Sequence, residues 1–241
     1  MQAHGAQCLL MGGQACILYG AAEFSRDTDL AILAEPDNLK RMNAALTALD
    51  AEVIAVPPFD ASFLARGHAV HFRCRRSDVA GMRVDVMSRM RGVDSFPTLW
   101  ERRTTVSIPE TENIPGAELE VLSLSDLVTA KKTQRDKYWP MLRRLVEVNW
   151  FEHREEATAE RIAFWLRELR TPALLIECAS TFSDAAVRAA AERPAVHAAL
   201  AGKLAAVERA LATEQEHERT LDAAYWAPLR RELELLRREV R

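Results

Sequence analysis

The hydrophobic pattern of this chain changes near residue 150, and this change restricts the folds that the chain can adopt. Before that point, short apolar runs typical of buried strands alternate with segments of helical periodicity. After it, the chain is rich in Ala, Leu, Glu and Arg, and apolar residues recur at helical spacing. We therefore predict an α/β (α+β) core with a mixed sheet over residues 1–149, followed by an α-helical C-terminal domain over residues 150–241 with breaks near Pro172, Pro194 and Pro228.

Short strands and helices are predicted to follow one another in the first half. The segment MRVDVM, residues 82–87, alternates apolar and polar side chains as a half-buried strand does. A helix is predicted over residues 37–49, and a longer one over residues 125–148 that Pro140 should kink or divide. The remaining predictions are strands at residues 8–11, 30–33, 52–56 and 68–74, a helical turn or two at residues 14–21, and loops at Pro57-Pro58 and IPETENIPG.

The composition is that of an ordinary soluble protein. Hydrophobic residues make up 49% and charged residues 28% of the 241 residues, and the net charge of −3 gives no global argument for nucleic acid or membrane binding. The first residues lack the basic segment of a signal peptide, and no apolar stretch reaches the ~18 residues of a membrane span. The four cysteines form no CxxC pair, so we predict reduced thiols in a cytoplasmic protein.

Two carboxylates stand just before the apolar run LAIL. Asp27 and Asp29 are separated by one residue, so on a strand their side chains point to the same face. Because like charges repel, either a positive group lies between them or they face open water. Asp85 stands in the middle of MRVDVM, where a lone acid is costly to bury. We predict that the three acids form an all-oxygen site for Mg²⁺ or Mn²⁺.

The glycine pair Gly12-Gly13 ends the first predicted strand. Without side chains, these residues let backbone N–H groups at the start of the next helix approach triphosphate oxygens. Two divalent cations can hold the attacking and leaving oxygens of a nucleotidyl transfer. The glycines and the three acids together predict chemistry on a nucleoside triphosphate (NTP).

The order of these motifs resembles that of the DNA polymerase β-like nucleotidyltransferase superfamily. It consists of a hydrophobic strand, Gly-Gly, a short segment and then Asp-x-Asp followed by a hydrophobic residue. The family motif falls on Gly12, Gly13, Asp27 and Asp29, and Asp85 matches the third acid on a later strand. The resemblance implies a nucleotidyltransferase core over about residues 8 to 148, in which the three acids are catalytic and bind Mg²⁺ or Mn²⁺.

Among the branches of this superfamily, the chain is similar to the abortive-infection toxin-type nucleotidyltransferases, which pair with an antitoxin protein. That branch carries a lysine-rich helix after the core, and the matching segment is SLSDLVTAKKTQRDKYWPMLRRLVE. Glu23 stands near the place of an arginine that the branch carries ahead of the first Asp, and Arg26 would substitute for it. The implied nucleotide-binding residues are Gly12, Gly13, Ser25, Arg26, Lys131, Lys132, Arg135 and Lys137.

Two clusters of positive charge accompany the motif. On the predicted helix, Lys132 and Arg135 share a face and would neutralise triphosphate charge, unless they simply form a solvated helix face. Nine arginines lie between Arg66 and Arg103. They would hold an RNA backbone such as a tRNA end, or a phosphorylated small molecule, unless they pair with acids of the C-terminal half.

We predict a metal-dependent nucleotidyltransferase that moves an NMP from an NTP to a hydroxyl acceptor, with the 3′ end of a tRNA as one candidate acceptor. The acceptor attacks the α-phosphate and expels pyrophosphate, while Asp85 helps to remove the proton of the acceptor. Two alternatives stay open. One is a catalytically degenerate module that binds a nucleotide or a partner protein, and the other is an enzyme that modifies a small molecule such as an aminoglycoside.

Overall fold

The computed structural model describes residues 1–111 and 116–239, which form two compact units. The first unit comprises Met1–Ala130 and Ala224–Arg241, and the second comprises Lys131–Ala223. The first contains a seven-stranded mixed sheet with helices, and the described elements of the second are all helices. The predicted fold class is confirmed. The predicted domain boundary after residue 149 stays a prediction.

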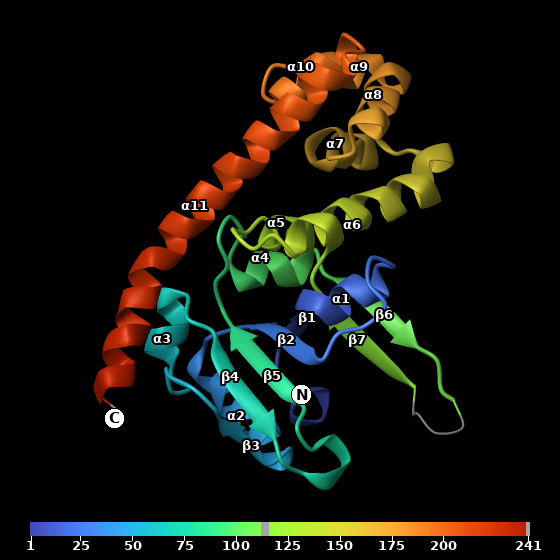
Figure 1. The fold of residues 1–241 in the computed structure, drawn as a ribbon. Coiled ribbons are helices and arrows are strands. Elements are labelled where there is room, and N and C mark those ends of the chain that lie inside the picture. The colour runs from blue at the N-terminus through green and yellow to red at the C-terminus, as the bar shows by residue number, and fades with distance from the viewer. Residues whose placement is uncertain (112–115, 240–241) are drawn as a thin grey trace. The chain divides into compact units, whose positions relative to one another are not determined.

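The sheet of the first unit has the strand order β3-β4-β5-β2-β1-β7-β6 (Figure 1). Two neighbouring pairs are parallel, β2 with β5 and β1 with β7, whereas the other neighbours are antiparallel. The bounds are Cys8–Met11 for β1, Asp27–Ile32 for β2, Ala51–Val53 for β3, Val70–Cys74 for β4, Arg83–Met87 for β5, Thr104–Ile108 for β6 and Ala117–Val121 for β7.

One face of the sheet is apolar, because side chains alternate along β2, β4 and β5. Helices α2 (Pro36–Ala48) and α3 (Ala61–Arg66) contribute to the same core. Its buried side chains include Leu30, Ile32, Met42, Leu46, Leu64, Val70, Phe72, Val84 and Val86. Since the side-chain period of a strand is two, the intervening residues Asp27, Asp29 and Asp85 lie on the opposite face.

Helix α1 (Gly12–Leu18) follows β1 without a loop, and Tyr19 at its end is hydrogen-bonded to strand β6 and to the residue after β7. The Tyr19 hydroxyl lies 2.9 Å from Thr104 Oγ1 and donates to the Leu122 carbonyl at 3.0 Å. Two further helices complete this unit, α4 (Phe96–Glu101) and α5 (Leu124–Ala130).

The predicted strands are all present, with shifted ends. Most importantly, β2 begins at Asp27 rather than at residue 30, so both acids lie inside the strand. Strands β6 and β7 were not predicted, because each leaves most side chains partly or fully exposed and so lacks a clear apolar alternation. Residues 112–115 of the predicted IPETENIPG loop lie outside the described residues.

The helical segment predicted over residues 125–148 is divided, but at residues 131–137 and not at Pro140. Helix α5 ends at Ala130, a loop covers residues 131–137, and α6 (Tyr138–His153) follows. Pro140 does not divide α6 but lies in its first turn, where a proline N–H would have had no intrahelical partner.

Tertiary hydrogen bonds fix this loop in place of a helix. The backbone N–H of Gln134 donates to Asp222 Oδ2 at 2.9 Å, and the indole N–H of Trp139 donates to the Thr133 carbonyl at 2.9 Å. Asp222 is almost fully buried, so its carboxylate requires such donors. The loop therefore satisfies groups that a continuous helix would leave without partners.

The second unit packs around the aromatic pair Trp150 and Trp165, whose ring centroids lie 4.9 Å apart in an edge-on arrangement. The predicted breaks at Pro172 and Pro194 are confirmed as the starts of two helices, whereas the break predicted at Pro228 is wrong because this residue lies inside α11. The helices that follow α6 along the chain are α7 (Ala159–Glu168), α8 (Pro172–Thr181), α9 (Ser183–Ala189), α10 (Pro194–Leu200) and α11 (Leu204–Glu239). No helix in the described part of the chain has the length and apolar character that crossing a membrane requires.

The last turns of α11 belong to the first unit, where a polar contact holds them. Glu232 Oε2 lies 2.7 Å from Nε2 of the buried His68, and Glu232 Oε1 lies 2.8 Å from Arg66 Nη2. Leu229 is buried beside this contact, in the turn after Pro228. These contacts stabilise the helix beyond its proline.

A buried ion pair connects two segments of the first unit. Asp126 of α5 is almost fully buried and accepts hydrogen bonds from Arg102 Nε at 2.7 Å and Nη2 at 2.6 Å. Replacing Arg102 with Met should lower the free energy of unfolding by about 2 kcal/mol, because it removes the charged donor of a buried carboxylate. Urea denaturation measures this loss.

Arg75 provides a matched control, because it pairs with Glu52 and both side chains are more than half exposed. Arg75→Met should change the free energy of unfolding by less than about 0.5 kcal/mol. Equal losses in the two variants would contradict the structural role given to Arg102.

Candidate functional site

The three predicted acids lie together on one face of the central strands. Asp29 of β2 is in register with Asp85 of β5, and Asp27 precedes Asp29 by two residues. Partners in a parallel pair point to the same face, and neighbouring strands lie about 4.8 Å apart. The sequence prediction that these carboxylates converge from two strands is therefore consistent with the sheet register.

A positive side chain lies among the acids. Arg83, two residues before Asp85, donates from Nε to Asp85 Oδ1 at 2.8 Å. The pKa of Arg83 is raised above its ordinary value by this hydrogen bond, which outweighs the effect of burial, and further by the charges of Asp85, Asp27 and Asp29. Its guanidinium therefore offsets the repulsion within the acidic cluster.

His71 of β4 is a second partner of Asp85. Its Nδ1 lies 2.9 Å from Asp85 Oδ1 and 3.1 Å from Arg83 Nη2. Burial by itself raises the pKa of Asp85, but the hydrogen bonds and charges of His71 and Arg83 outweigh burial and hold this pKa below its ordinary value. Asp85 is therefore ionised at neutral pH.

The glycine pair lets the start of α1 lie directly against two of the predicted site residues. A Cβ placed on Gly12 would overlap the carboxylate of Asp29 and lie 2.6 Å from Asp29 Cβ. A Cβ placed on Gly13 would overlap the hydroxyl of Ser25 and lie 2.8 Å from Ser25 Cβ. The Gly-Gly motif is thus packed against the Asp-x-Asp strand and the residues that precede it.

The loop before β2 carries the other two predicted residues, Ser25 and Arg26. Ser25 Oγ donates to the Asp27 carbonyl at 3.1 Å, which fixes the entry to the strand. Arg26 Cζ lies 6.0 Å from the ring centroid of Phe24, whose side chain is 72% exposed. An aromatic ring this exposed, three residues before Asp27, offers a surface on which a nucleobase can stack.

The lysines and arginine predicted to bind a nucleotide lie in the loop at residues 131–137 of the second unit, not on a helix. Lys132 forms an ion pair with the buried Glu168 at 2.8 Å. Three other cations surround the ring of Tyr138, with Lys131 Nζ at 4.5 Å from its centroid, Lys137 Nζ at 5.2 Å and Arg135 Cζ at 5.8 Å. The predicted shared helix face of Lys132 and Arg135 is therefore wrong, because the helix that would carry it is absent.

The arginines between Arg66 and Arg103 pair mostly with nearby acids rather than with the C-terminal half. Arg66 pairs with Glu232, which comes from that half. Five others pair within the sheet unit, as Arg75 with Glu52, Arg76 with Asp78, Arg83 with Asp85, Arg102 with Asp94 and Asp126, and Arg103 with Glu120. These pairs weaken the positive field that the sequence predicted.

The acidic cluster has the ligand chemistry that Mg²⁺ prefers, because all three donors are carboxylates. Within the described residues, no three His, Cys, Asp or Glu side chains already have the spacing of a metal site. Arg83 and His71 hold Asp85 Oδ1, so a cation that uses this oxygen must displace them. The donor set fits the cation, with Arg83 as the side chain that has to withdraw.

Sequence reasoning missed three residues of this site, namely His71, Arg83 and Phe24. Arg83 could have been found, because it precedes Asp85 by two residues on a predicted strand and so shares its face. His71 required the register between β4 and β5. Comparison with protein-family models and with curated proteins finds no match to this sequence, so the functional argument depends on the geometry of this site.

Replacing Gly12 with Ala should destabilise the first unit by about 2 to 4 kcal/mol, from backbone strain and from overlap with Asp29. Gly12 has a φ of +68°, which disfavours any side chain, and the new methyl group would displace the Asp29 carboxylate. Gly81 is the matched control, because its φ is +83° and no atom lies within 4 Å of a Cβ there. Gly81→Ala should lose only the strain part in urea denaturation. A loss as large as that of Gly12→Ala would contradict the close packing on Asp29.

Replacing Arg83 with Gln should raise the pKa of Asp85, because it removes a charged donor. A depressed carboxyl pKa stabilises the fold above the unfolded value, near 3.8, and this stabilisation is lost as the pH falls through the folded value. The variant should therefore lose it at a higher pH than the parent chain. Carboxyl ¹³C NMR titration measures the pKa, and Arg76→Gln, which removes the partner of Asp78, should leave it unchanged. An unchanged pKa in Arg83→Gln would refute the coupling.

Proposed function

We propose that this protein is a metal-dependent nucleotidyltransferase that moves an NMP from an NTP to a hydroxyl acceptor. The observation that supports it best is the packing of Asp29 in the place of a Gly12 side chain, while Asp29 is also in register with Asp85. This arrangement joins the glycine turn and the acids into one site, as binding of a triphosphate and its cation requires.

In this proposal, Asp27, Asp29 and Asp85 hold Mg²⁺ or Mn²⁺. When bound, the cation screens the charge of the triphosphate and of the departing pyrophosphate. The depressed pKa of Asp85, caused by its hydrogen bonds to His71 and Arg83 against the opposing effect of burial, keeps the carboxylate ionised. This property suits a cation ligand better than a base, because an efficient base has a pKa near the working pH.

The remaining side chains then orient the reactants. Arg83, once withdrawn from Asp85, and the exposed Arg73 beside it in register bind triphosphate oxygens. Phe24 stacks on the nucleobase. The acceptor oxygen bonds to the α-phosphorus, the bond from this phosphorus to the bridging oxygen breaks, and pyrophosphate leaves with the electron pair. His71 receives the acceptor proton as a general base, because it lies beside Asp85 in the proposed site.

The acceptor belongs to the proposal as a hydroxyl, with the 3′ end of a tRNA as the first candidate and a small molecule such as an aminoglycoside as the second. An antitoxin partner is also proposed, on the resemblance of the sequence to the abortive-infection toxin-type nucleotidyltransferases. A cytoplasmic location is also part of the proposal, and the four free cysteines support it.

A second candidate function is nucleotide or protein binding without turnover. One observation favours it, because Asp85 Oδ1 already has two partners, Arg83 and His71. In a degenerate site these partners would stay in place and exclude the cation. Saturable binding of an NTP without label transfer to any acceptor would support this candidate over the enzyme.

Asp29→Asn and Asp85→Asn should each reduce nucleotidyl transfer by about 100-fold or more, because each removes a charged ligand at the reacting phosphate. The assay incubates the full chain with each α-labelled NTP, Mg²⁺ and either total tRNA or an aminoglycoside. Glu52→Gln is the control, since Glu52 is an exposed acid on the edge strand β3 and should leave transfer unchanged. Full activity in either Asp variant, with folding verified by circular dichroism, would refute the proposal.

A further inference from the structure

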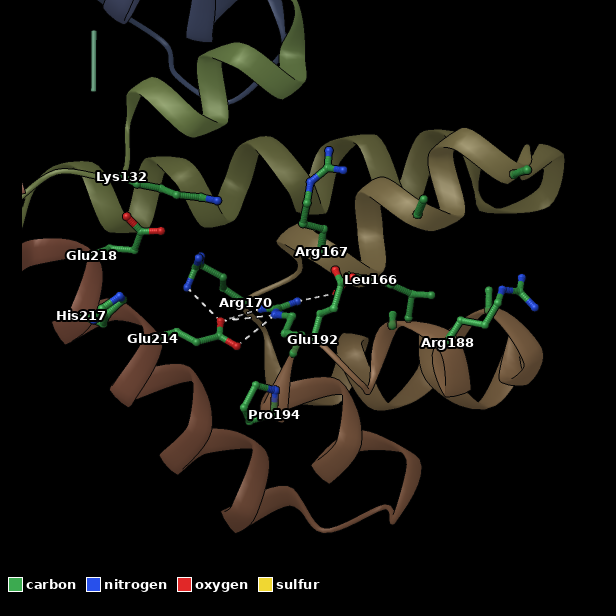
Figure 2. Close-up of a pocket in the computed structure, with 15 residues that line it drawn as sticks. Lys132, Leu166, Arg167, Arg170, Arg188, Glu192, Pro194, Glu214, His217 and Glu218 are labelled. Atoms are coloured by element: carbon green, nitrogen blue, oxygen red, sulfur yellow. Dashed lines mark hydrogen bonds and ion pairs between the residues drawn. The ribbon is translucent and has the colours of Figure 1, made fainter. Parts of the chain in front are cut away.

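The second unit contains a cavity of about 610 Å³ whose lining residues all belong to that unit (Figure 2). Its walls come from α7, α9, the start of α10 and the first half of α11. Small side chains, including Ala159, Ala163, Ala185 and Ala189, leave room in the wall. Among the charged lining residues, five Lys or Arg side chains face three Glu side chains, so the cavity has an excess of positive charge.

Two arginines of this cavity share one carboxylate. Arg193 donates from Nη2 and Nε to Glu214 at 3.0 Å, and also donates to the Leu166 and Leu169 carbonyls at the end of α7. Arg170 reaches the same Glu214 only through one long contact, from Nη1 at 3.4 Å. Arg193 is therefore a structural residue held by several hydrogen bonds. Arg170, in contrast, makes only one long hydrogen bond to the Glu214 carboxylate.

Arg170 is buried with few partners, namely the long contact to Glu214 and the ring of Trp139, whose centroid lies 5.2 Å from Arg170 Cζ. Its side chain is only 8% exposed, and within the described residues its Nε has no hydrogen-bond partner. Burial lowers the pKa of Arg170, and the neighbouring charge of Arg193 lowers it further, against the weaker opposite effect of nearby glutamates. A buried guanidinium in this state has lost its hydration without regaining the equivalent in ion pairs and hydrogen bonds.

Other lining residues extend the positive surface from Arg170. Figure 2 shows Arg170 and Glu214 near the centre of the cavity, with Lys132 and Arg188 at different sides of it. Lys132 is held by Glu168, whereas Arg188 is exposed. An anion beside Arg170 therefore meets a guanidinium that is already ordered and desolvated, within a wall that carries further cations.

We propose that this cavity binds a small organic phosphate. A phosphate monoester carries a charge of about −1.5 to −2 near pH 7 and has three strong acceptor oxygens, which matches a poorly partnered guanidinium better than a single carboxylate does. The cavity volume exceeds that of a phosphate ion many times, and its alanine-lined wall offers apolar surface to an organic body. The site is independent of the proposed transferase reaction.

The test uses isothermal titration calorimetry on the full chain carrying Asp29→Asn and Asp85→Asn, in EDTA, so that the acidic face cannot hold a metal–nucleotide complex. The probes are AMP, ribose 5-phosphate, inorganic phosphate and adenosine. We expect AMP or ribose 5-phosphate to bind more tightly than inorganic phosphate, and adenosine to bind weakest. Equal binding of AMP and adenosine, or no binding of either organic phosphate at millimolar concentration, would overturn the proposal.

Variants of the cavity locate the binding. Arg170→Gln and Arg188→Gln should each weaken binding of the organic phosphate by about tenfold or more, since each removes a charge-assisted hydrogen-bond donor. Arg144→Gln on α6 is the matched control, because Arg144 is an exposed arginine of the same unit that does not line the cavity. If Arg170→Gln fails to fold, Arg188→Gln decides alone. The proposal would be overturned if Arg188→Gln, and Arg170→Gln where it folds, bound the organic phosphate as tightly as the parent chain. It would also be overturned if Arg144→Gln lost as much affinity as the cavity variants.

Discussion

The repulsion among three carboxylates on one face of two parallel strands is the constraint on which the first unit depends. The register between β2 and β5 fixes Asp29 beside Asp85, and the two-residue period adds Asp27 to the same face. Arg83 supplies compensating charge to this cluster, and His71 adds a second partner to Asp85. The same compensation keeps Asp85 ionised, so the interaction that allows the fold also prepares the acids for a cation.

The glycine pair connects this cluster to the chain that precedes it. Because Gly12 has no side chain, the backbone at the start of α1 lies in contact with the Asp29 carboxylate. A methyl group on Gly12 would overlap this carboxylate. Gly13 does the same for Ser25, which in turn bonds to the backbone of Asp27. The motif residues are therefore coupled by packing, and a change at either glycine alters the position of an acid.

The parts of this fold that could be predicted from the sequence are those determined by the local pattern of apolar and polar residues. Alternation in MRVDVM placed Asp85 on a strand, and the i, i+2 rule placed Asp27 and Asp29 on one face. The break at residues 131–137 was not predictable in this way, because its hydrogen-bond partner Asp222 stands 88 residues away from Gln134. The weakly patterned strands β6 and β7 were missed for lack of local signal, and the deficit of Arg170 became visible only from which groups surround it.

The two charged clusters also differ in what a ligand must do to bind. On the acidic face, Arg83 and His71 already contact Asp85, so part of the binding free energy of a cation is spent on displacing them. In the cavity of the second unit, Arg170 lost its hydration during folding, and its contacts are the long one to Glu214 and the one to the ring of Trp139. In our proposal, an anion there binds a guanidinium that is already desolvated and ordered, and shares this group with Glu214. In the two proposals, the phosphate binds an arginine that stays in place, whereas a cation that uses Asp85 Oδ1 must displace Arg83 and His71.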